Sequence, residues 1–222
     1  MPTNQTPRSF NSRRLRARLV TWIKGTTSAG VQTAISEIRH NLGAGSGMVF
    51  TLLVVAGAAD VDEVRDACLE AGREHPSRII IATDGSSRSD RMDAEIQIGQ
   101  DVPGEVITLK FHGEVAQHKA SALLPLLLPD SPVIAWWPGA GPAHPSTDDI
   151  GVLASRRITD AMGSEDPVAA LVERACCLAP GDTDLTWTRL TPWRALLASA
   201  LDRPRGTVLS GSVHADAHNA PG

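Results

Sequence analysis

The sequence predicts an α/β protein with a Rossmann-like layered sheet, mostly parallel but with one antiparallel pair, followed by a partial helical second domain. Two observations carry this prediction. Apolar, β-rich runs of strand length alternate with amphipathic stretches of helix length, the order typical of a parallel sheet covered by helices. In addition, alternating apolar and polar residues occur at 94–99 and again at 105–111, which indicates two antiparallel neighbours.

The composition is that of a globular protein with a substantial core. The chain has 222 residues, of which 42% are hydrophobic and 21% are charged. A formal net charge of −4 gives no general attraction to nucleic acid or to an anionic membrane surface. No apolar run reaches the roughly 20 residues of a membrane span. We therefore expect neither nucleic acid nor a membrane as a partner.

The three cysteines are too sparse for a disulfide framework. Such sparse cysteine usage is typical of a reducing compartment, so we expect a cytoplasmic protein. Cys68 has a core role in a predicted helix. The adjacent pair Cys176 and Cys177 would point about 100° apart on a helix, and a redox role for this pair stays open.

Basic residues dominate the start of the chain. The first acidic residue, Glu37, is preceded by Arg8, Arg13, Arg14, Arg16, Arg18 and Lys24. We interpret residues 1–44 as a basic, flexible N-terminal arm and a helix. A targeting peptide is the alternative, although the stretch lacks the apolar centre of a secretory signal.

Residues 45–163 are predicted to form the α/β domain. Its buried strands are expected at apolar, β-rich runs, namely 48–56, 78–83 and 132–137. Between the first two runs, a helix is expected to begin after Asp60, with Glu63 at the spacing of a capping box, and to end before Pro76.

Two further helices are expected in the same domain. Residues 114–128 have helical character, with a break or kink at Pro125. Thr147 is expected to cap another helix, whose inward face includes Ile150, Leu153 and Ile158.

Residues 164–222 are predicted to form a partial C-terminal domain of two helices, one strand and a disordered tail. The first helix begins at Asp166-Pro167, an N-cap followed by proline at the first helical position, and Pro180-Gly181 ends it. A second helix is expected to start in the same way at Thr191-Pro192. The stretch 206–213 has strand character, and such a strand either joins the first sheet or belongs to an incomplete domain.

The search for catalytic, metal and cofactor motifs gives no match. The glycine-rich stretch 43–47 precedes its strand, whereas a dinucleotide-binding loop follows one. Residues 112–118 begin like a zinc deaminase site but lack its downstream Pro-Cys-x-x-Cys. Asp84 ends a strand, where it would border a ligand crevice or form a simple turn, and we favour the turn. We therefore expect no enzymatic activity, no cofactor, no catalytic residues and no metal ligands.

Tryptophan, arginine and aspartate gather in three stretches near 136, 156–160 and 182–194. Trp and Arg dominate protein–protein hot spots, but the aspartates can equally pair with the arginines in a buried polar network. Side chains alternate along a strand, so Trp136 and Trp137 are expected on opposite faces. The candidate residues for binding a partner, or for supporting its surface, are Trp136, Trp137, Arg156, Arg157, Asp160, Asp182, Asp184, Trp187, Arg189, Trp193 and Arg194.

Several ordered segments resemble the OpcA family of glucose-6-phosphate dehydrogenase assembly proteins, in its actinobacterial form. The most specific are LPDSPVIAWWPG (128–139), RRITDA (156–161) and GDTDLTWTRLTPWRALL (181–197). The segments HPSRIIIAT (75–83), GEVITLKFHG (104–113) and GMVFTLLVV (47–55) fit the same family, and the similarity runs from about Leu19 to about Leu201.

The resemblance implies a non-catalytic protein that binds glucose-6-phosphate dehydrogenase and promotes its active oligomer, at the entry to the oxidative pentose phosphate pathway. It also implies a longer C-terminal domain than this chain has, so we expect a shortened C-terminus. It supplies no catalytic residues, and the redox control of some relatives cannot be matched to these cysteines. The alternative, from the residues alone, is an α/β domain or enzyme that binds a sugar phosphate or nucleotide, with Arg156, Arg157 or Arg189 holding the phosphate.

Overall fold

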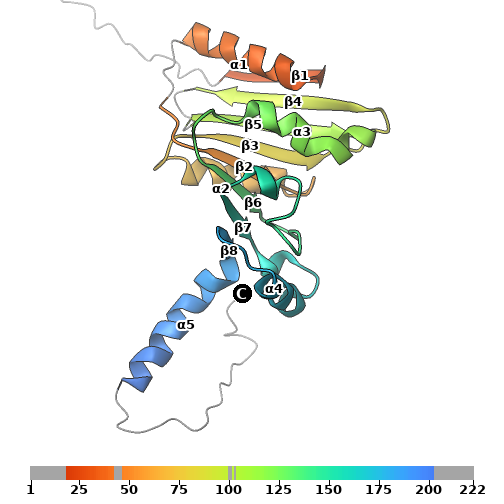
Figure 1. Ribbon diagram of the computed structural model, residues 1–222. Helices are drawn as coiled ribbons and strands as arrows, with labels where there is room; N and C mark the ends of the chain where they lie inside the picture. Colours follow the sequence, from red (N-terminus) through yellow and green to blue (C-terminus); the bar gives the residue numbers. More distant parts are fainter. Residues whose placement is uncertain (1–18, 43–46, 100–101, 103, 203–222) are drawn as a thin grey trace, which may run out of the picture.

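A mixed sheet of eight strands forms the body of the protein, in the order β1-β4-β5-β3-β2-β6-β7-β8 (Figure 1). The computed structural model describes residues 19–42, 47–99, 102 and 104–202. The strands are β1 (Leu19–Thr26), β2 (Thr51–Val55), β3 (Ser77–Asp84), β4 (Arg91–Ile98), β5 (Gly104–His112), β6 (Val133–Trp137), β7 (Arg156–Thr159) and β8 (Asp182–Asp184).

The sheet is parallel except around β4, which pairs antiparallel with both β1 and β5. This confirms the predicted α/β class, the mostly parallel sheet and the antiparallel pair. The central strands β3 and β5 are buried along almost their whole length. Strands covered on both faces have no solvent side, which is why RIIIAT reads as a continuous apolar run rather than an alternating one.

Helices cover the two faces of the sheet unequally. On one face, α1 (Ser28–Leu42) and α3 (Lys119–Leu123) close the larger core cluster, to which α1 contributes Val31, Ile35 and Ile38. On the other face, α2 (Val61–Ala71) closes a smaller cluster through Val61, Val64 and Cys68. The helix predicted for 114–128 is a 3₁₀ turn, the short α3 and a second 3₁₀ turn that contains Pro125.

The last two helices pack against the sheet much less. Both α4 (Pro167–Cys176) and α5 (Leu185–Leu201) lie at the β8 end of the sheet, and α5 extends away from the body of the molecule (Figure 1). Arg174 is the buried residue of α4, and α5 has no buried residue. The chain therefore presents two helices whose apolar side chains lack the cover that α1 and α2 have.

Three predictions of local structure are wrong. Asp60 has helical backbone angles and makes no capping hydrogen bond through its side chain, so no capping box forms. The helix expected after Thr147 is only a 3₁₀ turn at Gly151–Leu153, with Asp148 accepting hydrogen bonds from the N–H groups of Ile150 and Gly151; the following residues form β7. Thr191-Pro192 does not start a helix, because α5 begins after Asp184 and Pro192 lies inside it.

The sheet reaches beyond the predicted α/β domain at both ends. The edge strands β1 and β8 lie outside residues 45–163, yet both pair with strands of that range. The division into an arm, an α/β domain and a partial C-terminal domain stays a prediction. The basic arm before residue 19, the glycines at 43–46 and the expected strand at 206–213 lie outside the described residues.

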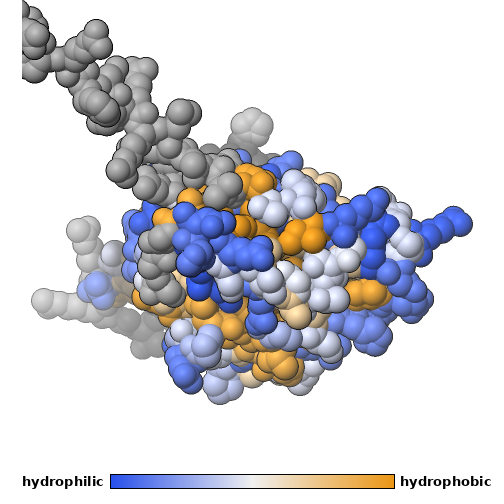
Figure 2. All heavy atoms as spheres, turned by 90° about the horizontal axis from the view of Figure 1, so that it is seen from above, coloured by the Kyte–Doolittle hydropathy of each residue, from blue (hydrophilic) through white to orange (hydrophobic). Residues whose placement is uncertain are grey.

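The β1 edge is amphipathic. Val20 and Trp22 of β1 are exposed, and in the view from above hydrophilic side chains interrupt the hydrophobic ones (Figure 2).

Among the described residues, no helix is long and apolar enough to cross a membrane.

Candidate functional site

The two tryptophans of β6 lie on opposite faces of the sheet, as the alternation predicts. Trp137 is 4% exposed and belongs to the larger core cluster. Trp136 packs half-buried against the smaller cluster, and its buried Nε1 has no hydrogen-bond partner among the described residues. Trp137 is therefore a core residue, whereas Trp136 is partly accessible.

The predicted polar residues of β7 and β8 meet across the two strands. Register pairs Arg157 with Asp182. The Arg157 guanidinium is buried, donates from Nε to Asp182 Oδ1, and also donates to the carbonyls of Ala154 and Pro180. Asp182 in turn accepts from the N–H of Ala179. This ion pair holds β8 on the edge of the sheet.

A tight turn brings β8 into this register. Gly181 has a φ of +94°, and a Cβ there would lie 2.4 Å from the carbonyl oxygen of Ser155. The Pro180-Gly181 pair thus both ends the preceding segment and allows the close approach of β8 to β7.

A second ion pair joins β8 to α4. Asp184 accepts from Arg174 Nη1 at 3.0 Å and from the Thr159 hydroxyl at 2.8 Å. Burial raises the pKa of the Asp184 carboxyl, but the hydrogen bonds from the N–H of Thr186, the Thr159 hydroxyl and the N–H of Ala161 outweigh it, so the pKa lies below its ordinary value. Asp184 is also the N-cap of α5.

Arg174 completes this pair, and the sequence analysis missed it. Its guanidinium is buried and also donates to the carbonyls of Gly141 and Pro142, in the loop after β6. The only sequence signal was its place beside Glu173 on the mostly apolar helix 167–176, which suggests a solvent-facing charge rather than a buried one.

A third ion pair fixes α5. Arg189 donates two hydrogen bonds to Asp160, at 2.6 and 2.7 Å, and Asp160 also accepts from the N–H of Met162. These hydrogen bonds raise the pKa of the Arg189 guanidinium, which therefore stays charged at neutral pH. The three aspartates, together with Arg157, Arg174 and Arg189, thus form ion pairs that join β7, β8, α4 and α5.

The remaining predicted residues are exposed. Trp187 is 56% exposed, and the Arg194 guanidinium stacks on its ring, 3.9 Å from the centroid. Trp193 and Arg156 are also exposed. The structure therefore separates the set: the aspartates, Arg157, Arg189 and Trp137 support the fold, whereas Arg156, Trp187, Trp193 and Arg194 face solvent.

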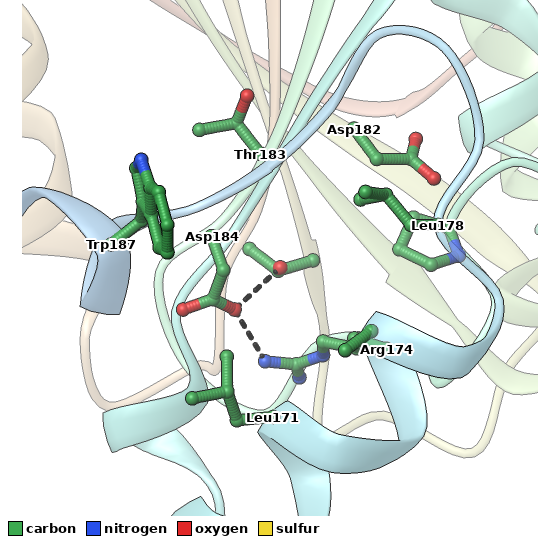
Figure 3. Close-up of a pocket in the computed structure, with 10 residues that line it drawn as sticks. Leu171, Arg174, Leu178, Asp182, Thr183, Asp184 and Trp187 are labelled. Atoms are coloured by element: carbon green, nitrogen blue, oxygen red, sulfur yellow. Dashed lines mark hydrogen bonds and ion pairs between the residues drawn. The ribbon is translucent and has the colours of Figure 1, made fainter. Parts of the chain in front are cut away.

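A pocket of about 370 Å³ lies between α4, β8 and the start of α5 (Figure 3). Its walls are largely apolar, with Leu171 and Leu178 on one side and Trp187 on the other. The polar groups at its base, Arg174 and Asp184, are paired with each other. Such a pocket suits an apolar group better than a sugar phosphate, which needs an unpaired cation.

Ser87, His112 and Asp93 lie together, but their geometry does not activate the serine. His112 Nε2 lies 3.1 Å from Asp93 Oδ2, and His112 Nδ1 accepts from the backbone N–H of Ser87. The Ser87 hydroxyl instead bonds to Ser89 and Arg91. Among the described residues, none that contacts the Ser87 hydroxyl is a base that could remove its proton.

The other candidates for chemistry have structural partners. Asp84 pairs with Lys119 at 2.8 Å. Burial raises the pKa of the Cys68 thiol to about 12, which leaves it protonated, while Cys176 and Cys177 are exposed. The described residues contain no group of three or more His, Cys, Asp or Glu side chains that could hold a metal ion.

The fold and the site define an α/β protein whose carboxyl-terminal helices, joined to the sheet by ion pairs, expose an apolar surface with tryptophan and arginine. Two family models match the chain in order: the N-terminal domain of the OpcA glucose-6-phosphate dehydrogenase subunit at residues 69–176, and its C-terminal domain at residues 180–222. The chain belongs to the OpcA family. Comparison with curated proteins and with solved structures finds no significant match.

Proposed function

We propose that this protein is a non-catalytic assembly factor and allosteric activator, which binds glucose-6-phosphate dehydrogenase and promotes its active oligomer. The observation that carries the proposal is the match of both family domains in their proper order, since the family is described as a subunit of that enzyme. We further propose that it acts in the cytoplasm, as the sparse cysteines suggest.

The geometry of the molecule supports this function. The three aspartates at β7 and β8, Asp160, Asp182 and Asp184, are each held in an ion pair with an arginine, which favours a structural over a catalytic role. At the same end, apolar side chains of α4 and α5 are exposed, among them Val168, Val172 and Leu196. A surface of this kind is typical of a protein-interaction site. The pocket favours an apolar guest, so a sugar-phosphate or nucleotide enzyme is not retained as a second candidate.

Activation requires a difference in affinity between two states of the dehydrogenase. A bound protein shifts an oligomer or conformational equilibrium only by as much as it prefers the active state. A tenfold shift needs about 1.4 kcal/mol of preference, which one or two well-packed anchor residues supply.

The test measures the activity of the dehydrogenase and the mass of its complex with this protein in the same samples. The purified chain is mixed with the dehydrogenase of its own organism, and NADP reduction and the mass of the complex are followed together over a range of dehydrogenase concentrations. We expect a co-eluting complex and a higher specific activity, with the largest gain at low concentration, where the enzyme alone is least assembled. Absence of both a complex and a rate change would contradict the proposal.

A further inference from the structure

The pocket between α4, β8 and α5 is electrically neutral inside. Its base holds the Arg174–Asp184 pair, and Asp182, which also lines it, is paired with Arg157. Because each charge is compensated, the interior offers no binding energy to an isolated anion or cation. The exposed walls, formed mainly by Leu171, Leu178 and Trp187, are apolar (Figure 3). The interior therefore selects an apolar group.

The uncompensated charge lies at the rim. Arg194 stacks on Trp187, so its guanidinium lies against the ring that forms one wall of the pocket. In the part of the chain that the structure describes, no carboxylate lies within ion-pair distance of Arg194, whereas Arg189 on the same helix is satisfied by Asp160. The helix α5 contains no acidic residue. This rim is thus complementary to a single negative charge next to an apolar group.

The combination is that of an interface anchor. Tryptophan offers a large rigid apolar area, and an arginine held on an aromatic ring has lost much of its conformational freedom before binding. Further apolar side chains are exposed on both helices, Val172 on α4 and Trp193 and Leu197 on α5. A partner that fills the pocket would therefore also cover apolar surface around it.

We propose that this pocket is an anchor site for the dehydrogenase, and that it takes one large apolar side chain of that enzyme with a neighbouring carboxylate bound by Arg194. The inference rests on the proposed function and adds the place and the chemistry of recognition. The apolar group displaces water between Trp187 and α4, and the carboxylate accepts two parallel hydrogen bonds from the guanidinium.

The experiment measures the Kd for the dehydrogenase with substituted full-length chains. Trp187→Ala and Leu178→Glu each change an exposed wall residue and are expected to raise the Kd at least tenfold. Trp22→Ala is the matched control, because Trp22 is 58% exposed, lies on the opposite edge strand and also has a cation over its ring, Lys110 at 5.4 Å. It is expected to leave the Kd unchanged.

The dependence of the Kd on salt distinguishes an electrostatic role of Arg194 from a role in packing alone. Arg194→Ala is expected to weaken binding at low ionic strength and to flatten the dependence of the Kd on salt, since a charge pair is removed. Arg194→Lys is expected to keep most of the salt dependence. A merely structural arginine would leave the salt dependence unchanged.

The outcomes separate this inference from the proposed function. If the unsubstituted chain binds the dehydrogenase while the Trp187, Leu178 and Arg194 variants, shown to be folded by circular dichroism, bind with the same Kd and salt dependence, the anchor site is overturned and the function stands. If the unsubstituted chain does not bind, the proposed function falls, and this occupant of the pocket falls with it. Loss of binding by the Trp22 variant as well would contradict a localised anchor.

Discussion

At the scale of single residues, the aspartates are what join the carboxyl-terminal helices to the sheet. Asp182 holds β8 through Arg157, Asp184 holds α4 through Arg174, and Asp160 holds α5 through Arg189. Buried ion pairs add little net stability compared with apolar packing, but the loss of one partner leaves an uncompensated charge. The pairs therefore act chiefly by fixing the positions of β8, α4 and α5 relative to the rest of the sheet.

Removal of the Asp184 charge tests this reading. Asp184→Asn keeps the size of the side chain but leaves the Arg174 guanidinium, 6% exposed, without a counter-charge. We expect the free energy of unfolding at pH 7 to fall by about 3–5 kcal/mol, measured by urea denaturation. Asp62→Asn is the control, since Asp62 is exposed and its pair with Arg65 should contribute less than about 1 kcal/mol. Equal losses in the two variants would contradict the assignment.

The same carboxylate gives a pH dependence. The pKa of Asp184 is lower in the folded chain than in the unfolded chain, so its stabilising effect is fully present above the unfolded pKa of about 3.9. The effect is lost as the pH falls through the lower folded pKa. We expect the unsubstituted chain to lose more stability than Asp184→Asn between pH 5 and pH 2, measured by urea denaturation at each pH. Parallel curves for the two chains would contradict the shift.

At the scale of elements, α5 is a helix held at its first turns only. Asp184 caps it and Arg189 ties it to Asp160, but from Thr191 onward its side chains are exposed. Pro192 lies in its interior, where it removes one backbone hydrogen bond and its ring crowds the carbonyl one turn earlier. Apolar side chains of α4 are likewise uncovered, since Val168 and Val172 are both exposed.

Substitution of Pro192 should therefore strengthen α5 without affecting the core. A proline inside a helix is about 3 kcal/mol less favourable than alanine. We expect Pro192→Ala to slow amide hydrogen exchange in α5, and Ala195→Gly to speed it, because glycine is about 1 kcal/mol less favourable than alanine. Exchange in β3 serves as the internal reference and should be the same in both variants. No change in α5 exchange would show that α5 is held by something other than its own helicity.

At the scale of the whole molecule, stability is distributed unevenly along the sheet. The centre, β3 and β5, is covered on both faces, with Ile79, Ile80 and Ile107 fully buried. At the other edge, β8 has only three residues and none of them is buried, and α5 has no buried residue either. The surface proposed to meet the dehydrogenase thus belongs to the least buried part of the fold.

Native-state hydrogen exchange should reproduce this gradient. Amides of β3 and β5 are expected to exchange only by global unfolding, with rates that depend steeply on urea, whereas amides of α5 should exchange by local opening with little dependence on urea. Addition of the dehydrogenase should protect α4 and α5 selectively. Uniform protection of the core and α5 in the free chain would contradict the gradient.

The sequence by itself determined the elements with a strong local signal. The apolar runs of β2, β3 and β6 and the alternating runs of β4 and β5 gave the class of the fold, because burial on one or both faces dictates hydrophobic periodicity. The Asp166-Pro167 start of α4 was predicted correctly as well, since capping depends on neighbours in sequence. The family was recognisable from the ordered segments around the tryptophans and arginines.

The tertiary structure alone decided which of these residues are buried and which face solvent. β8 is the acidic tripeptide DTD, which has no strand signal. It forms a strand because Arg157 pairs with its Asp182 and because β7 pairs with it in parallel. Arg174 has no sequence signal for burial, since its partner Asp184 lies on a different element. The separation of supporting aspartates from exposed Trp187 and Arg194 likewise depends on how α5 leaves the sheet. Pairing and exposure are set by contacts between elements, and such contacts leave no period in the sequence.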